Sequence, residues 1–325
     1  MAVRLLHLVQ GGDRSRMRDV AAVIHELGGI AQKRQLVALG ARDADLTRAV
    51  RGNEVFRVRQ GWYSTMSVDR PEVRAMRVGG RLTGLSAIAA AGGWVLGIPP
   101  LHVSVPRNAA RLRSPVNRFA ARVRGRRSAA RVHWDHPRVA ETGTVASVGL
   151  LDAMERVVRD EPLEVAVAAL DWALHTRRFD GTDLDILVAR LPASRRAIRD
   201  WVDPACESLP ESLARTRLRV GGHHVVTQTP VGNNQRIDLV VDGVVALETD
   251  GEAYHRDRFD ADRAKDLTMT IHGYHALRAT ARMIFRDWGR VENAIECALR
   301  GRGVPALAAT QQHGRARASP PPDAI

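Results

Sequence analysis

The sequence predicts a multidomain chain that combines α/β and α+β folds, and three observations lead to this expectation. The chain has 325 residues, which corresponds to two or three domains of ordinary size. Hydrophobic residues make up 45% of the chain, which excludes a wholly disordered protein. Charge is divided unevenly, because residues 1–150 contain 25 basic and 10 acidic side chains and residues 151–325 contain 24 and 26. A basic half beside a near-neutral half predicts a polyanion-binding part joined to a part with another role.

The basic side chains are almost all arginines. Of the 49 Lys and Arg residues, only Lys33 and Lys265 are lysines. Because a GC-rich genome also favours arginine, the distribution of charge along the chain is more informative than its net value of +13.

The cysteine content and the N-terminus predict a cytoplasmic protein. Cys206 and Cys297 are too few for a disulfide framework and fit a reducing compartment. Residues 1–18 lack the apolar core and cleavage site of a secretory signal. Residues 82–105 contain no Asp, Glu, Lys or Arg, but their glycines and prolines favour a buried helix over 82–91 and a strand over 101–105 rather than a membrane span. We therefore expect a soluble protein without a membrane partner.

Residues 1–65 are predicted to form three helices followed by a hairpin. Asp13 can cap a first helix that runs to about Leu27, and further helices are expected over 31–39 and 44–51. Residues 55–59 alternate as a strand, turn at 60–61 and return at 62–63. Three helices with a β-wing are typical of the winged-helix fold, a variant of the helix-turn-helix DNA-binding domains.

The third helix of this winged helix would be the recognition helix. The candidate DNA-binding residues are Arg42, Arg48 and Arg51 on or beside that helix, and Arg57 and Arg59 on the wing. The alternative is a small helical domain whose arginines are only solvated.

Residues 70–192 are predicted to form a basic α+β middle region. Nine arginines and no acidic residue lie between Arg107 and Arg131. Within this segment, Arg124, Arg126 and Arg127 are expected on a loop or strand edge that faces phosphates. A strand edge with solvated arginines is the alternative, and the residues do not decide between the two. Residues 148–191 have helical periodicity and are expected to be packing helices, up to a boundary at Pro192.

Residues 195–302 are predicted to form the third domain, an α/β unit, and the proline-rich tail 303–325 is expected to be disordered. Ser208 fits the N-cap of its first helix, with Glu211 at the capping-box position. The order expected after this helix is a strand over 225–229, a hairpin, a helix over 260–272, a strand over 274–278 and a helix over 284–299.

The hairpin of the third domain concentrates acidic residues around the turn signal Asp242–Gly243. A two-residue turn would pair Asp238 with Leu247 and put Glu248 on the opposite face. A three-residue loop over 241–243 would instead pair Asp238 with Ala246. We prefer the second register because it separates apolar from acidic residues. It places Ile237, Leu239, Val245 and Leu247 on one face and Asp238, Glu248 and Asp250 on the other.

Three carboxylates on one face repel one another unless a cation neutralises them or one stays protonated. Such oxygen ligands suit Mg²⁺ or Mn²⁺, so Asp238, Glu248 and Asp250 are the predicted metal ligands. An ion held there could polarise a phosphodiester and lower the pKa of an attacking water. His255 closely follows this strand and is a candidate for acid/base transfer. The alternative is an exposed strand end whose acids are solvated.

This order of elements, with these residues, resembles the restriction-endonuclease-like PD-(D/E)xK superfamily, and most closely its branch related to very-short-patch-repair endonucleases. The resemblance covers residues 195–302 and lies in Glu207–Glu211, Gln228, Arg236–Leu239, Leu247–Gly251, His255, Asp262–Leu267 and His272–Arg278. The N-terminal part is similar to the winged-helix part of abortive-infection type IV antitoxins, through Phe56–Tyr63, Gly80–Ala87 and Leu101–Val105.

The first resemblance implies a restriction-endonuclease-like α/β core that hydrolyses DNA with bound Mg²⁺ or Mn²⁺. It assigns Asp238 and Glu248 to the metal, Glu211 (or Glu207) to the acid of the first helix, and His255 to a catalytic histidine. Asp250 stands where the superfamily has its usual lysine, two positions after the glutamate. Lys265 is expected on the following helix and could replace that lysine only through the tertiary geometry.

Three functions therefore stay open. The first is a metal-dependent DNA endonuclease with a DNA-binding winged helix. The second is a transcriptional regulator or type IV antitoxin-like protein with an inactive nuclease-like domain, for which a toxin gene or its product would be a partner. The third is an enzyme that acts on RNA, because the acidic site does not distinguish the two sugars.

Overall fold

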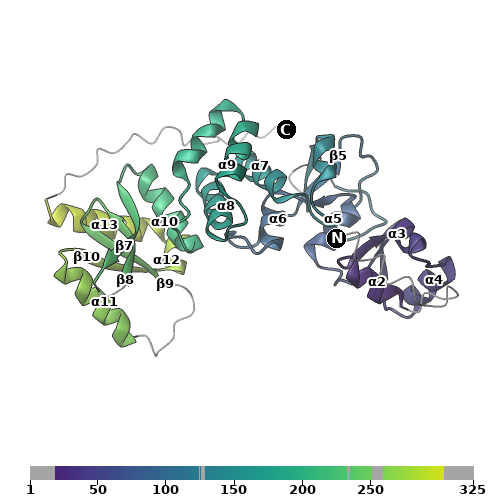
Figure 1. Ribbon diagram of the computed structural model, residues 1–325, viewed down its shortest axis with the longest axis horizontal. Helices are drawn as coiled ribbons and strands as arrows, with labels where there is room; N and C mark the ends of the chain where they lie inside the picture. Colours follow the sequence, from purple (N-terminus) through teal and green to yellow (C-terminus); the bar gives the residue numbers. More distant parts are fainter. Residues whose placement is uncertain (1–18, 124, 126–128, 233–234, 251–258, 304–325) are drawn as a thin grey trace, which may run out of the picture. The chain divides into compact units, whose positions relative to one another are not determined.

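The computed structural model describes residues 19–123, 125, 129–232, 235–250 and 259–303 (Figure 1). The chain divides into two compact units, and each consists of two separate stretches of sequence. The first unit comprises residues 1–162 and 181–197, and the second comprises residues 163–180 and 198–325. Both mix helices with small β-sheets, so the expected class of an α/β and α+β chain agrees with the structure at this level.

The N-terminal part of the first unit has three helices and a three-stranded antiparallel sheet. Its elements are α2 (Val20–Glu26), β1 (Ile30–Gln32), α3 (Lys33–Ala38), α4 (Asp43–Arg51), β2 (Phe56–Arg59) and β3 (Trp62–Ser64), and the strand order is β1-β3-β2. Asp19 caps α2 through the backbone N–H of Ala22, whereas the predicted cap Asp13 lies outside the described residues. The start of the second predicted helix is strand β1, because Ile30 and Ala31 pair with β3 and are buried under the helices.

The rest of the first unit surrounds a second three-stranded sheet. Its elements are α5 (Pro71–Val78), β4 (Arg81–Leu82), α6 (Gly84–Ala90), β5 (His102–Pro106), β6 (Arg131–Asp135), η3 (Pro137–Glu141), α7 (Leu150–Asp160) and α9 (Gly181–Arg190). Strand β5 is central, antiparallel to β4 and parallel to β6. The apolar stretch 82–105 forms a short helix and a strand as expected, and none of the described helices is long and apolar enough to cross a membrane.

The second unit is a four-stranded sheet with helices on both faces. Its elements are α8 (Leu163–His175), α10 (Leu209–Val220), β7 (Val225–Val231), β8 (Gln235–Val241), β9 (Val245–Asp250), α11 (Phe259–Ile271), β10 (His275–Thr280), α12 (Ala281–Arg286) and α13 (Trp288–Gly301), and a 3-10 segment, η4 (Ala193–Trp201), leads into it. The strand order is β10-β9-β8-β7, with β9 and β10 parallel and the other neighbours antiparallel. The final helix predicted over 284–299 is two helices, because Asp287 leaves the helical conformation.

The two faces of this sheet carry separate apolar clusters. Leu239, Val241, Val245 and Leu247 pack with α10, α12 and α13 on one face. Val240 and Ala246 pack with Met269 of α11 on the other, and Figure 1 shows α11 on the opposite side of the sheet from α10 and α13. Ile237 belongs to the α11 cluster, so its predicted place beside Leu239 is wrong.

The β8–β9 register also differs from the prediction. Leu239 pairs with Leu247 and Val241 with Val245, so the three-residue loop covers 242–244 rather than 241–243. The predicted pairing of Asp238 with Ala246 is therefore wrong, because the ladder continues toward Glu248 instead. The carboxylate of Asp242 accepts the backbone N–H of His224 at 2.8 Å and faces His223 at 2.7 Å, which anchors the loop at this position.

Candidate active site

A half-buried carboxylate, Asp238 in the middle of β8, meets a buried one, Glu248 near the end of β9. The backbone N–H of Asp238 donates to Glu248 Oε1 at 3.2 Å. In the other direction, Asp238 Oδ2 accepts the N–H of Thr249 at 2.8 Å and its hydroxyl at 3.1 Å. Only 5% of Glu248 is exposed. The observed register therefore brings together the two acids that the sequence analysis placed first among its metal ligands.

Lys265 of α11 adds a positive charge to this pair. Its ammonium group donates a hydrogen bond to Glu248 Oε2 and forms an ion pair with it. Burial raises the pKa of Glu248, and the neighbouring Asp238 raises it further, while Lys265 lowers it. Burial likewise raises the pKa of Asp238, against the hydrogen bonds from Thr249 and the charge of Lys265. One ammonium group thus lies beside two carboxylates whose pKa values are both raised.

Glu211 lies beside the same cluster, at the start of α10. Its Oε1 accepts the hydroxyl of Ser208 at 2.7 Å, and its Oε2 accepts the backbone N–H of Glu207 at 2.9 Å. Oε2 also accepts the side-chain amide of Gln228 at 3.1 Å. Burial raises the pKa of Glu211, the hydrogen bonds lower it, and the charge of Asp238 again raises it. Glu211 therefore stabilises the helix start, as the capping-box spacing predicted, and also belongs to the electrostatic environment of Asp238.

Gln228 has an unusual backbone conformation for its position. Its φ of 50° lies in the left-handed region, which a residue with a side chain rarely adopts within a strand. On β7 it stands between Thr227 and Thr229, which pair with Leu239 and Ile237, so it lies opposite Asp238. Strained backbone of this kind is often found at functional sites.

Asp250 has a different partner from the other predicted metal ligands. Its Oδ1 accepts from a guanidinium nitrogen of Arg278 at 3.0 Å. The same guanidinium contacts Asp266 at 2.8 Å and Asp262 at 3.5 Å, both on α11. Arg278 pairs with Glu248 in the parallel β9–β10 ladder. From there its long side chain reaches Asp250 at the end of β9 and the two acids on α11. The structure thus brings Asp238 and Glu248 together and holds Asp250 in an ion-pair network.

The carboxylates of Asp238 and Glu248 could hold a divalent ion only if water molecules supplied the other ligands. Among the described residues, no group of three His, Cys, Asp or Glu side chains is arranged to hold a metal ion. Mg²⁺, however, often takes only one or two protein carboxylates and keeps several waters. Asp238 and Glu248 satisfy that requirement. The candidate histidine, His255, lies outside the described residues.

Most of the predicted DNA-binding arginines of the N-terminal part lie at the surface. Arg42 precedes α4, and Arg48 and Arg51 lie on it, with Arg48 paired to Asp45 at 3.1 Å. Arg57 on β2 is also exposed, and its guanidinium lies 5.6 Å from the ring centroid of Tyr63.

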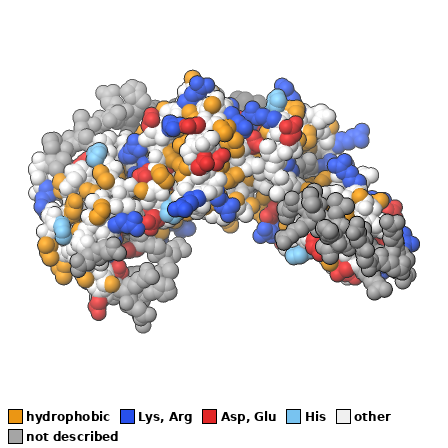
Figure 2. Space-filling model, viewed as in Figure 1, with side chains coloured by type: hydrophobic (Ala, Val, Ile, Leu, Met, Phe, Trp, Pro, Cys, Tyr) orange, Lys and Arg blue, Asp and Glu red, His pale blue; other side chains and the backbone are white. Residues whose placement is uncertain are grey.

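Arg59 differs from the other wing arginine, because it is half-buried and donates to the carbonyl of Val78 at 3.4 Å. Burial lowers its pKa, and the charge of Arg113 lowers it further. The residues Arg124, Arg126 and Arg127 lie outside the described part of the chain. On the face shown in Figure 2, Lys and Arg side chains are spread among acidic and apolar ones.

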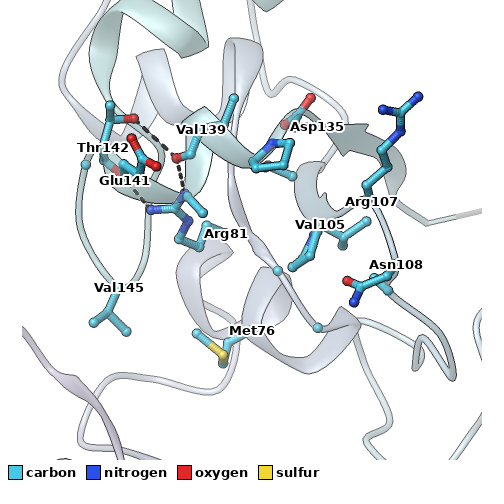
Figure 3. A pocket seen from close by; sticks show the side chains of 18 of the residues that line it. Met76, Arg81, Val105, Arg107, Asn108, Asp135, Val139, Glu141, Thr142 and Val145 are labelled. Carbon is cyan, nitrogen blue, oxygen red and sulfur yellow. Dashed lines mark hydrogen bonds between the residues drawn. The ribbon is translucent and has the colours of Figure 1, made fainter.

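Arg59 also lines a cavity of the first unit that the sequence did not reveal (Figure 3). The cavity has a volume of about 1220 Å³. Arg81 on its wall donates to the carbonyls of Val139, Thr142 and Thr144 at 2.5, 2.7 and 3.0 Å, so this guanidinium holds the loop after η3. Asp135, also on the wall, is paired with Arg156 at 2.7 Å. Arg81 and Asp135 are thus engaged in holding the fold.

No family model and no curated protein matches the chain. The interpretation of the site therefore rests on its residues and their geometry.

The sequence analysis named three residues of this site without placing them in it. Lys265 carried one signal, since it is one of only two lysines in a chain with 47 arginines. Gln228 and Arg278 lay in segments similar to the nuclease superfamily, but their contacts depend on strand register. Neither contact could be derived from spacing alone.

Proposed function

We propose that the second unit is a metal-dependent phosphodiesterase and that the whole protein is a DNA endonuclease. The observation that carries this proposal is the position of Lys265, whose ammonium group contacts Glu248 beside Asp238. A lysine beside two carboxylates is the combination that the superfamily resemblance requires, although here it comes from a helix. The two free cysteines, Cys206 and Cys297, agree with the reducing cytoplasm as the compartment.

Each residue of the cluster has a role in this proposal. Asp238 and Glu248 would hold Mg²⁺ or Mn²⁺, which would lower the pKa of a bound water and stabilise charge on the phosphate. Lys265 would donate a hydrogen bond to the attacking water or to a phosphate oxygen, where charge develops during hydrolysis. Thr249 orients Asp238 by two hydrogen bonds. Glu211 and Gln228, which are joined by a hydrogen bond, would line the site next to Asp238.

DNA is the proposed substrate because of the first unit. The basic half of the chain has a net charge of +15, and Arg42, Arg51 and Arg57 are exposed around α4 and the β2–β3 hairpin. Three helices with such a hairpin support a winged helix that contacts the phosphate backbone.

The same arginines support the second candidate, an antitoxin-like regulator that binds DNA without cutting it. In that case the chain would bind duplex DNA but show no cleavage under any metal condition. A toxin gene or its product would then be the further partner.

The decisive experiment uses the full chain with plasmid, nicked and mismatched duplex DNA, and RNA as a further arm. We expect nicking with Mg²⁺ or Mn²⁺, no nicking in EDTA, and loss of nicking in Asp238→Asn. Asp242→Asn is the matched control, because Asp242 lies on the same hairpin but contacts His223 and His224. Cleavage that is equal in Asp238→Asn and wild type would overturn the proposal, and binding without cleavage would favour the regulator.

A further inference from the structure

A small hairpin over residues 112–122 is held firmly in the first unit. Its two arms are joined by backbone hydrogen bonds from Ser114 to Ala120 at 2.9 Å and from Arg122 to Leu112 at 3.1 Å. At its tip, the side-chain oxygen of Asn117 accepts the backbone N–H of Phe119 at 2.9 Å. The hairpin therefore has a defined conformation of its own.

Two contacts fix this hairpin against neighbouring elements. The backbone N–H of Arg113 donates to the carbonyl of Val78 at the end of α5, at 3.2 Å. The guanidinium of Arg118 donates to the carbonyl of Arg57 on β2, at 2.6 Å. The second contact places the 112–122 hairpin beside the predicted DNA-binding wing.

Despite this fixation, aromatic rings are left open to solvent. Phe119 is 75% exposed and Trp134, on β6, is 49% exposed. Each ring has a guanidinium close to it: that of Arg118 lies 4.6 Å from the centroid of Phe119, and that of Arg122 lies 6.0 Å from the centroid of Trp134. A rigid hairpin that displays large apolar rings to water is typical of a binding surface.

The basic sequence of the hairpin and its flanks favours an anionic partner. The described residues of the segment 107–131 include six arginines and no acidic residue. Exposed rings beside guanidinium groups match the two parts of a nucleic-acid strand, because bases stack on rings and phosphates pair with arginines. In a duplex the bases are already stacked on each other, so an exposed ring reaches only unpaired bases.

We propose that the 112–122 hairpin and Trp134 form a binding surface for single-stranded nucleic acid, with unpaired bases stacked on Phe119 and Trp134. This inference builds on the proposed function, since it gives the endonuclease a preference for DNA with a flap, gap or bubble. The basic region was predicted to contact phosphates, and the proposed surface adds contacts to the bases.

The test is fluorescence anisotropy of the full chain with labelled oligo(dT), oligo(U) and a duplex of equal length, in EDTA. We expect the single strands to lose affinity about 5- to 100-fold in Phe119→Ala and in Trp134→Ala, as is usual for the loss of one stacked base. Affinity for the duplex should change less than twofold. Phe119→Trp should retain binding and Phe119→Leu should lose it, because stacking requires a ring and not only an apolar side chain.

Ile98→Ala is the matched control, since Ile98 is 99% exposed and lies outside the hairpin. Circular dichroism of each variant checks that it is folded. Unchanged affinity for single strands, or an equal loss for single strands and duplex, would overturn the inference. Because EDTA prevents metal-dependent cleavage, this result is independent of whether Asp238→Asn abolishes nicking.

Discussion

The second unit contains two buried clusters of charged side chains that are built on opposite principles. In the first, Asp171 of α8 is fully buried and meets Arg215 of α10, which is 2% exposed, at 2.9 Å. The same oxygen of Asp171, Oδ2, also accepts from the hydroxyl of Ser212 at 2.6 Å, and Oδ1 accepts the backbone N–H of Asp203 at 2.7 Å. In the second cluster, two carboxylates, Asp238 and Glu248, lie beside one ammonium group, which is paired with Glu248.

We use this difference in charge balance to distinguish a structural ion pair, Asp171–Arg215, from a candidate active site, Asp238–Glu248. The Asp171–Arg215 cluster is balanced, so its charges offset each other and it joins two helices. In the Asp238–Glu248 pair, burial raises the pKa of both groups, the charge of Asp238 raises that of Glu248 further, and Lys265 supplies only one positive charge, so we regard this pair as unbalanced. An unbalanced buried pair costs stability, and a bound cation would relieve that cost. This contrast can be tested by variants in each cluster.

The largest effect on stability is expected from the balanced cluster. Asp171→Ala leaves Arg215 buried without its carboxylate partner and should lower the free energy of unfolding by about 3–5 kcal/mol. Urea denaturation followed by circular dichroism measures this change. Glu164→Ala is the control, because its pair with Arg217 also joins α8 to α10 but is partly exposed, and it should cost about 1 kcal/mol or less. Similar costs in both variants would contradict the assignment of Asp171 as the structural pair.

The largest effect on activity is expected from the unbalanced cluster. Lys265→Met removes the ammonium group next to Glu248 and should reduce the nicking rate by about 100-fold or more, as for the loss of a group that stabilises charge at the reacting phosphate. The comparison is Lys33→Met, which removes the other lysine, an exposed residue paired with Asp43, and should leave the rate unchanged. If both variants cut DNA at the wild-type rate, Lys265 has no part in the reaction.

A smaller effect concerns stability and its dependence on pH. Asp238→Asn removes one of two neighbouring buried charges and keeps an oxygen that can accept from Thr249. Because burial raises the pKa of Asp238, the folded chain binds a proton there more tightly than the unfolded chain, and this contribution to stability is lost as pH rises through the folded pKa. In EDTA, the variant should therefore be more stable than wild type by about 1 kcal/mol at pH 8 and show little difference near pH 4.

Thermal denaturation of both chains between pH 4 and 8 gives this dependence. Glu248, Glu211, Asp250 and Lys265 face the same group and are unchanged in both chains. Asp250→Asn serves as the control, because Asp250 is paired with Arg278 and its removal should give no stabilisation at any pH. A variant Asp238→Asn that is less stable than wild type at pH 8 would show that the pair is balanced after all.

The sequence predicted the elements of the second unit better than their contacts. Apolar periodicity and the cap at Ser208 placed α10, β7, β8 and β9 close to their observed bounds. The hairpin register was predicted wrongly, because its loop is anchored by the contact of Asp242 with His223 and His224, which lie 19 and 18 residues earlier in the chain.

The composition of the site was predicted only in part for a related reason. Asp238 and Glu248 lie near each other in any β8–β9 hairpin whose register puts both side chains on the same face of the sheet. The contact of Lys265 with Glu248 depends on how α11 is rotated against the sheet, and that of Arg278 with Asp250 depends on the parallel pairing of β10. Side chains brought in from a following helix or strand leave no mark in the local pattern.

The membership of α8 in the second unit has a consequence for how this chain can be divided. The boundary between the units is crossed at residues 162–163, 180–181 and 197–198. A gene fragment that starts at residue 195 would encode the whole four-stranded sheet but omit Asp171, and Arg215 would be left buried without its counter-charge. Neither unit is a contiguous stretch of sequence, so during synthesis the first unit stays incomplete until α9 has left the ribosome.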